Sequence, residues 1–295
     1  MNKKIVNSYL MADGSRFTDK AGYETMTFDQ ECQNRDPRLA QTIRTPGYTR
    51  IGSTKKEAPN LAYTMTGYHL IKYSMTANYD EYNKSCNDIP LFRTAEVYLN
   101  FAEAKAELGT LKQADINKSI KLLRDRVGMT NLDMELANSK PDPYLMSAAT
   151  GYPNVKGANQ GVILEIRRER TIELAMEGFR YYDIMRWKEG KLFENDLLGI
   201  YVPGPGTYDL DKDGTDDVCF YVGTKPAGNV PLYLEIGEQI RLSNGESGYI
   251  ICHSLITKKW NEDRDYLYPV PISERTLSNG VITQNPGWND GLNFN

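Results

Sequence analysis

One stretch of the chain interleaves charged and apolar residues in an order that an ordinary amphipathic helix does not show. It reads ERTIELAMEGFRYYDIMRW and spans residues 169–187. A surface helix of a soluble protein usually collects its charges on one face and its apolar residues on the other. Charged residues distributed this evenly among apolar residues must either form ion pairs or lie on the surface without a structural role.

Six charged residues in this stretch are spaced to fall on neighbouring turns of a helix. At steps of four and then of three, they are Glu169, Glu173, Glu177, Arg180, Asp183 and Arg186. An exposed pair at such spacing contributes only about 0.2–0.5 kcal/mol, which does not explain a row of this length. We therefore expect the row to border a buried seam, where arginines and carboxylates also bridge to neighbouring helices.

The same stretch contains an apolar stripe and one glycine. The stripe consists of Thr171, Ile172, Ala175, Phe179 and Tyr182. Gly178 is expected to kink or divide the helix, because glycine inside a helix costs about 1 kcal/mol relative to alanine.

A second interpretation of the charged row makes two of the carboxylates the general acid and base of a glycoside hydrolase. Structural pairing is favoured, since partners are supplied on the same helix and paired carboxylates stay ionised.

An earlier segment predicts a helical hairpin. Its apolar residues recur at helical spacing, at Val97, Phe101, Ala104 and Leu108. Gly109 stops the first helix, and residues 115–127 form a second helix after a short turn. The pair is typical of a tetratricopeptide repeat, including the small Ala102 and Ala106, which let helices approach closely. One hairpin cannot bury its own apolar face, so its stacking partners should be other helices.

The whole chain, residues 1–295, is expected to form a single, mainly α region with long ordered loops and short β-strands. Residues 1–88 are rich in Gly, Pro, Asp, Asn and Tyr and predict ordered loops, followed by a helical core at 89–190. Residues 191–265 predict loops and short strands with an acidic turn. Residues 266–295 are punctuated by proline and should be extended.

Charge and composition exclude several classes of function. The net charge is −4 without any Lys/Arg run, so nucleic acid is not an expected partner. The chain has only two histidines, His69 and His253, which argues against a His-based triad or metal centre. The sequence predicts neither a membrane span nor the apolar region of a signal peptide.

The four cysteines do not form a metal or redox motif. Cys32, Cys86, Cys219 and Cys252 lie far apart without any CxxC pair. Buried free thiols are expected. Cys219 and Cys252 are the pair to test first for a disulfide.

Four ordered motifs carry a resemblance to a known family. They are NRDPR at residues 34–38, RTAEVYLNFAEA at 93–104, IRRERTIELAMEGFRYYDIMRW at 166–187, and YPVP at 268–271 with QNPGW at 284–288. In this order they resemble the signature segments of the SusD/RagB family. The fold class implied is a SusD-like α-helical fold that contains tetratricopeptide-type hairpins.

The resemblance implies a lipoprotein at the extracellular face of a Bacteroidetes outer membrane. Such proteins bind glycans without being enzymes, and deliver them to a SusC-type TonB-dependent transporter. In the family the motif residues mainly define the fold. That role would apply here to Arg170, Glu173, Glu177, Arg180 and Asp183, and would place Trp187 and Trp288 in the core.

The chain departs from the family pattern at its N-terminus. Family members open with a lipoprotein signal, a lipid-bearing cysteine and most of the helical repeats, whereas this chain begins near the family's midpoint. We therefore expect a truncated gene product, a fragment or an expressed C-terminal portion.

The acidic turn has the spacing of a calcium loop. In DLDKDGTDDV, Asp209, Asp211 and Asp213 supply oxygen ligands, Thr215 a carbonyl, and Asp217 a direct or water-mediated ligand. The twelfth position of the loop is a phenylalanine instead of the usual glutamate, and no flanking helices are evident. The sequence predicts a structural calcium site outside an EF-hand, with a solvated acidic turn as the alternative.

A tyrosine-rich segment is the expected place for a glycan. Sugars are bound by aromatic faces and planar polar side chains displayed on loops. Tyr48, Tyr63 and Tyr68 lie in such a context and are the candidates for stacking on a sugar. Trp260 is assigned neither to the core nor to the glycan site. Besides glycan binding, two alternatives are kept: a tetratricopeptide-type module that binds protein, and a carboxylate glycosidase.

Overall fold

Helices dominate the chain up to Trp187, and the strands follow. A computed structural model gives the structure, which describes residues 1–289 and 291. The α-helices are α1 (Lys3–Ser8), α2 (Phe28–Glu31), α3 (Pro37–Thr42), α4 (Thr94–Glu107), α5 (Gln113–Asn117), α6 (Ile120–Asp125), α7 (Met134–Ser139), α8 (Pro143–Met146), α9 (Gln160–Glu173), α10 (Arg180–Trp187) and α11 (Ile272–Leu277). Short 3₁₀ helices are η1 (Phe17–Asp19), η2 (Tyr23–Thr25), η3 (Ala77–Tyr79) and η4 (Gly190–Glu194). The strands are β1 (Leu197–Val202), β2 (Gly206–Tyr208), β3 (Val218–Tyr221), β4 (Leu232–Glu235) and β5 (Gly248–Cys252).

The strands form two small sheets. β1 and β5 pair antiparallel, with Leu197 opposite Cys252 and Val202 opposite Gly248. In the other sheet, β3 lies between β2, to which it is antiparallel, and β4, to which it is parallel. Cys219 on β3 and Cys252 on β5 therefore lie in different sheets. Both are free thiols, so the disulfide considered from the sequence is not formed.

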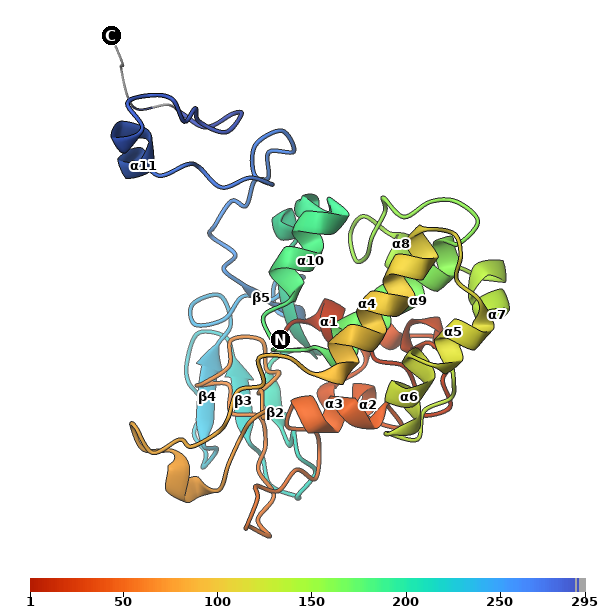
Figure 1. Ribbon diagram of the computed structural model, residues 1–295. Coiled ribbons are helices and arrows are strands. Elements are labelled where there is room, and N and C mark those ends of the chain that lie inside the picture. Colours follow the sequence, from red (N-terminus) through yellow and green to blue (C-terminus); the bar gives the residue numbers. More distant parts are fainter. Residues whose placement is uncertain (290, 292–295) are drawn as a thin grey trace.

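Helix α9 is buried along almost its whole length, from Gly161 to Glu173. Helix α4 packs along it, and α1, α6 and α7 also contact it (Figure 1). Val162 and Ile166 of α9 belong to a hydrophobic core built by the helices. Ile172 belongs to a second core, which is built by the N-terminal helices and the two sheets. Because α9 joins the two cores, its charged residues are buried as well.

Helices α9 and α10 are separate, as the glycine between them predicts. α9 ends before Gly178, which has a φ of +85°, and α10 begins after it. Glycine adopts positive φ without a steric cost. The predicted apolar stripe does not continue across the break, since Ile172 is buried whereas Tyr182 is 65% exposed. The prediction of one stripe is wrong because the non-helical residues 174–179 separate its two halves.

The first helix of the predicted hairpin is present as α4, but it buries a different face. Its buried residues are Ala95, Leu99, Ala102, Glu103 and Ala106. The predicted core residues Val97, Phe101 and Leu108 are exposed instead. That part of the prediction is wrong because the larger apolar residues face away from α9. The small Ala102 and Ala106 are buried and allow the two helices to approach closely, as expected. The second predicted helix is divided into α5 and α6 at Ser119, whose backbone is not helical.

The C-terminal segment around α11 lies apart from the helical body (Figure 1). Trp288 in this segment is half-buried, and its indole N–H donates to the Leu267 carbonyl at 2.9 Å. Its assignment to the core is therefore wrong, because its neighbours belong to the same segment. Trp187, in contrast, is buried as expected, and its indole N–H donates to Glu103 Oε1 at 2.6 Å.

Among the described residues, no helix combines the length and the apolar character that crossing a membrane requires.

Candidate functional site

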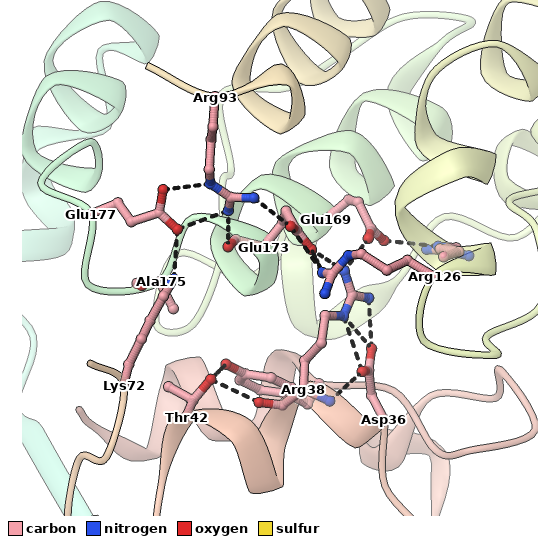
Figure 2. Close-up of polar contacts among 12 residues, drawn as sticks. Asp36, Arg38, Thr42, Lys72, Arg93, Arg126, Glu169, Glu173, Ala175 and Glu177 are labelled. Carbon is pink, nitrogen blue, oxygen red and sulfur yellow. Dashed lines mark hydrogen bonds and ion pairs between the residues drawn. The ribbon is translucent and has the colours of Figure 1, made fainter. Parts of the chain in front are cut away.

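Charged side chains from distant parts of the chain meet around α9 (Figure 2). The Glu169 carboxylate is fully buried between two guanidinium groups. Arg38 Nη1 donates to Glu169 Oε1 at 2.5 Å, and Arg124 Nε donates to Glu169 Oε2 at 2.8 Å. Arg38 Nη2 also donates to Asp36 Oδ2 at 2.7 Å. This pairing compensates a charge whose burial alone would be very costly.

Glu173 and Glu177 extend the ionic network beyond Glu169. Arg93 bridges them, with Nη1 2.8 Å from Glu173 Oε1 and Nε 2.7 Å from Glu177 Oε2. Arg126 Nη2 lies 2.9 Å from Glu173 Oε2, and Lys72 Nζ lies 2.5 Å from Glu177 Oε1. Both carboxylates line a pocket of about 330 Å³. Each of them has cationic partners there.

The protonation states of these carboxylates follow from their partners. Burial raises the pKa of Glu169, but the guanidinium groups of Arg124 and Arg38 outweigh burial and hold this pKa at about 2. Burial opposes ionisation of Glu177 too, and hydrogen bonds from Arg93 and Lys72 outweigh it and lower its pKa. A glycosidase needs a protonated carboxyl group as its general acid. The geometry in this pocket therefore favours ion pairing over catalysis.

Only some of the observed ion pairs join the residues that their spacing along the helix predicts. Arg186 Nη2 is 3.0 Å from Asp183 Oδ1, as expected for neighbouring turns. Arg180 instead donates to the Tyr152 hydroxyl at 3.0 Å. Arg170 Nε donates to Asp183 at 2.8 Å and links α9 to α10. The partners of the α9 carboxylates come from α3, α6 and the chain before α4, which the spacing within one helix does not reveal.

The three candidate tyrosines have different surroundings. Tyr68 has no exposed surface, and its hydroxyl donates to Glu31 Oε1 at 2.9 Å. A ring without an exposed face cannot stack on a ligand, so Tyr68 is a core residue. Tyr48 is half-buried, with the Arg44 guanidinium 5.5 Å from its ring centroid. Tyr63 is 84% exposed on the same long loop region.

The acidic turn brings three of its five predicted ligands together. Asp209, Asp211 and Asp217 each place a carboxylate oxygen within 4.8 Å of the others. Asp213 instead accepts a hydrogen bond from the Thr215 backbone N–H at 2.8 Å. Burial and then the neighbouring Asp213 raise the pKa of Asp211, and burial raises the pKa of Asp217. A divalent cation would compensate this concentration of negative charge.

The acidic turn also forms one wall of a pocket of about 380 Å³. The opposite wall is the loop of residues 55–62, and Arg44, Pro231 and Leu232 contribute further lining. Lys56 Nζ donates to the Lys212 carbonyl at 3.4 Å and so ties the two walls together. We call this cavity the loop pocket. The two walls of the loop pocket are distant segments in the sequence, and no local motif indicates that they meet.

Comparisons with known proteins agree with this fold. The sequence matches the model of the SusD family over residues 1–288. A SusD-like carbohydrate binding protein from Bacteroides fragilis NCTC 9343 has a similar structure, with a TM-score of 0.56 and 22% identity over 94% of this chain. A SusD-like protein from the same strain gives a TM-score of 0.57 and 22% identity over 97% of this chain.

The chain spans 47% and 46% of the lengths of those two proteins. No curated protein is a significant match to the chain.

Proposed function

The chain belongs to the SusD family, and on this premise we propose that it is a non-enzymatic binding protein for an oligosaccharide or polysaccharide. The fold that it shares with a SusD-like carbohydrate binding protein supports the proposal. The carboxylates on α9 and directly after it support the proposal too. Glu169 and Glu177 are ionised and ion-paired, so neither is suited to act as a general acid.

The loop pocket is the site that we assign to the glycan. Sugar hydroxyl groups form paired hydrogen bonds with planar polar side chains, and the loop pocket offers Arg44 and Asn60 for this purpose. Apolar surface for the C–H faces of a sugar comes from Pro59 and Leu232. This combination of polar and small apolar lining is the observation that carries the assignment.

Tyr48 and Tyr63 remain the candidates for stacking at the loop pocket. The Tyr48 carbonyl accepts a hydrogen bond from the Glu57 backbone N–H at 2.9 Å, so Tyr48 is tied to the loop that forms one wall. Tyr63 directly follows the last lining residue of that loop. Flat aromatic rings with polar edges suit one face of a sugar ring.

The proposed biological role is capture of the glycan at the extracellular face of the outer membrane. The captured ligand would pass to a SusC-type TonB-dependent transporter. Family membership supports this role. Co-purification of the protein with a transporter barrel would support this role.

A tetratricopeptide-type interaction module is the second candidate. The exposed apolar side chains of Val97 and Phe101 on α4, and of Leu108 directly after it, favour this candidate, because such a face is suited to packing against further helices. On this alternative, α4, α5 and α6 would form a tetratricopeptide-type hairpin that binds protein. Retention of a protein partner without any glycan binding would favour the alternative.

Affinity electrophoresis tests glycan binding at the loop pocket. Native gels contain soluble starch, xylan, galactomannan or mucin, and the wild-type protein should be retarded by at least one of them. The double change Lys55→Ala and Tyr63→Ala should weaken this retention about tenfold, because it removes the exposed lining residue Lys55 and the aromatic ring beside the pocket. Tyr82→Ala, which removes another exposed tyrosine, is the matched control. Unchanged retention of the double variant would exclude the loop pocket as the site.

We also propose a structural calcium ion at the acidic turn, held by Asp209, Asp211 and Asp217. The convergence of their carboxylates supports it. Calorimetry with calcium chloride should show binding to the wild type, and the melting temperature should fall in chelator. Asp211→Asn should remove both effects, whereas Asp216→Asn, outside the three converging carboxylates, should keep them. A wild-type protein with no calcium binding and the same melting temperature in chelator would exclude the ion.

A further inference from the structure

A row of aromatic rings lies along α10, η4 and the chain before α11, and none of these rings lines the loop pocket. Its members are Tyr181, Tyr182, Phe193, Trp260, Tyr266 and Tyr268, which we call the aromatic surface. The Tyr181 ring centroid lies 5.5 Å from that of Tyr182, 6.0 Å from Phe193 and 6.2 Å from Tyr268. Trp260 lies 5.4 Å from Phe193 and 5.0 Å from Tyr266. Each ring therefore touches the next.

Most neighbouring rings in the row are inclined to each other at shallow angles. The planes of Trp260 and Phe193 meet at 36°, those of Phe193 and Tyr181 at 39°, and those of Tyr181 and Tyr268 at 34°. Tyr181 is 37% exposed and Tyr268 is 65% exposed. Exposed aromatic patches of this kind on a soluble protein commonly mark a binding site.

The aromatic surface is held in place by contacts beneath it. Gly190 lies against the Trp260 indole so closely that a Cβ atom at this position would overlap the ring. The Trp260 backbone N–H donates to Glu194 Oε1 at 2.8 Å. The Tyr266 hydroxyl accepts a hydrogen bond from the Gly190 N–H at 2.9 Å and donates to Glu262 Oε2 at 3.0 Å. These contacts fix Trp260 and Tyr266 before any ligand arrives, which lowers the entropic cost of binding at these two rings.

We propose that the aromatic surface is a second glycan-contact site, which takes an extended chain of sugar rings and acts beside the loop pocket. The inference rests on the proposed function in glycan binding. The electron-rich faces of aromatic rings attract the C–H faces of sugars, and tyrosine hydroxyls at the ring edges can bond to sugar hydroxyls. Lys188 and Arg264 lie against Tyr266 and Trp288 and add donors nearby. A row of rings suits several consecutive sugar units better than a single one.

The test compares long and short glycans on the intact chain. The probes are the polysaccharide that retards the wild type in native gels and a short oligosaccharide of the same linkage. Tyr181→Ala with Tyr268→Ala should weaken polysaccharide binding about tenfold and leave oligosaccharide binding at the loop pocket unchanged. Tyr181→Phe with Tyr268→Phe keeps the rings and should retain most polysaccharide affinity. Thermal melting of each variant checks that it is folded.

The outcomes separate this inference from the proposed function. Equal polysaccharide affinity of the folded alanine variant and the wild type would overturn the aromatic surface as a glycan site, while glycan binding by the chain would stand. If the wild type is retarded by none of the four polysaccharides, both proposals fall. Loss of a co-purifying protein from the alanine variant, with glycan affinity unchanged, would assign the aromatic surface to protein contact and also overturn the inference.

Discussion

Glu169 has a fully buried carboxylate that is stabilised by two guanidinium groups. Glu169→Gln would keep the shape of the side chain but leave Arg38 and Arg124 without its charge. We expect the free energy of unfolding to fall by about 3–5 kcal/mol, the usual cost of breaking a buried ion pair. Urea unfolding measures this change. Glu81→Gln, in an exposed pair with Lys84, is the control and should have almost no effect.

The same residue predicts a dependence of stability on pH. The pKa of Glu169 is about 2 in the folded protein, against an ordinary value of 4.5. Because the folded pKa is depressed, the stabilisation by Glu169 is complete above pH 4.5 and is lost as pH falls towards 2. Between these values, unfolding free energies of the wild type should fall more steeply with acid than those of Glu169→Gln. Parallel pH profiles of the two proteins would contradict this role of Glu169.

At the residue scale, the sequence predicted that these charges are paired, but it did not identify the partners. Arg38 and Glu169 are separated by 131 positions, and Arg124 and Glu169 by 45. Contacts of this kind depend on the packing of helices, and no spacing within a helix contains that information. The acidic turn is the opposite case, because Asp209, Asp211 and Asp217 converge within one short loop.

At the scale of elements, the packing of α4 on α9 depends on small side chains. Ala102 is completely buried in the helical core. Ala102→Leu should lower the free energy of unfolding by about 1–3 kcal/mol, because a larger side chain would force the two helices apart. Ala104→Leu on the exposed side of α4 is the matched control and should be tolerated. Equal stability of the two variants in thermal unfolding would show that the faces of α4 are wrongly assigned.

The helices show which features of the sequence were sufficient to predict the structure. Gly178 correctly predicted a division between α9 and α10, because a glycine with positive φ acts locally. The buried face of α4 was predicted only in part. Ala102 and Ala106 are buried as expected, whereas Val97 and Phe101, which dominate the hydrophobicity pattern, are exposed. Periodicity identifies a helix, but the choice of its buried face depends on the shape of the neighbouring helix.

At the scale of the whole molecule, α9 joins a helical core to a second core of N-terminal helices and small sheets. The mainly helical character and the short strands after α10 follow from local patterns. The loop pocket could not be predicted, because Lys56 and Lys212, which tie its walls together, are 156 positions apart. The charged side chains around α9 connect it to α3, to α6 and to the chain before α4, and leave the exposed loops free to contact a ligand.

The most direct test of this division of roles is the dissociation constant of Glu173→Gln for the polysaccharide that retards the wild type. Glu173 is held by Arg38, Arg93 and Arg126, so the change weakens the scaffold in a pocket that shares no lining residue with the loop pocket. We predict an unchanged dissociation constant in the folded variant. A large loss of affinity, in a variant that thermal melting shows to be folded at the temperature of the measurement, would place the α9 carboxylates in the binding site and contradict their structural role.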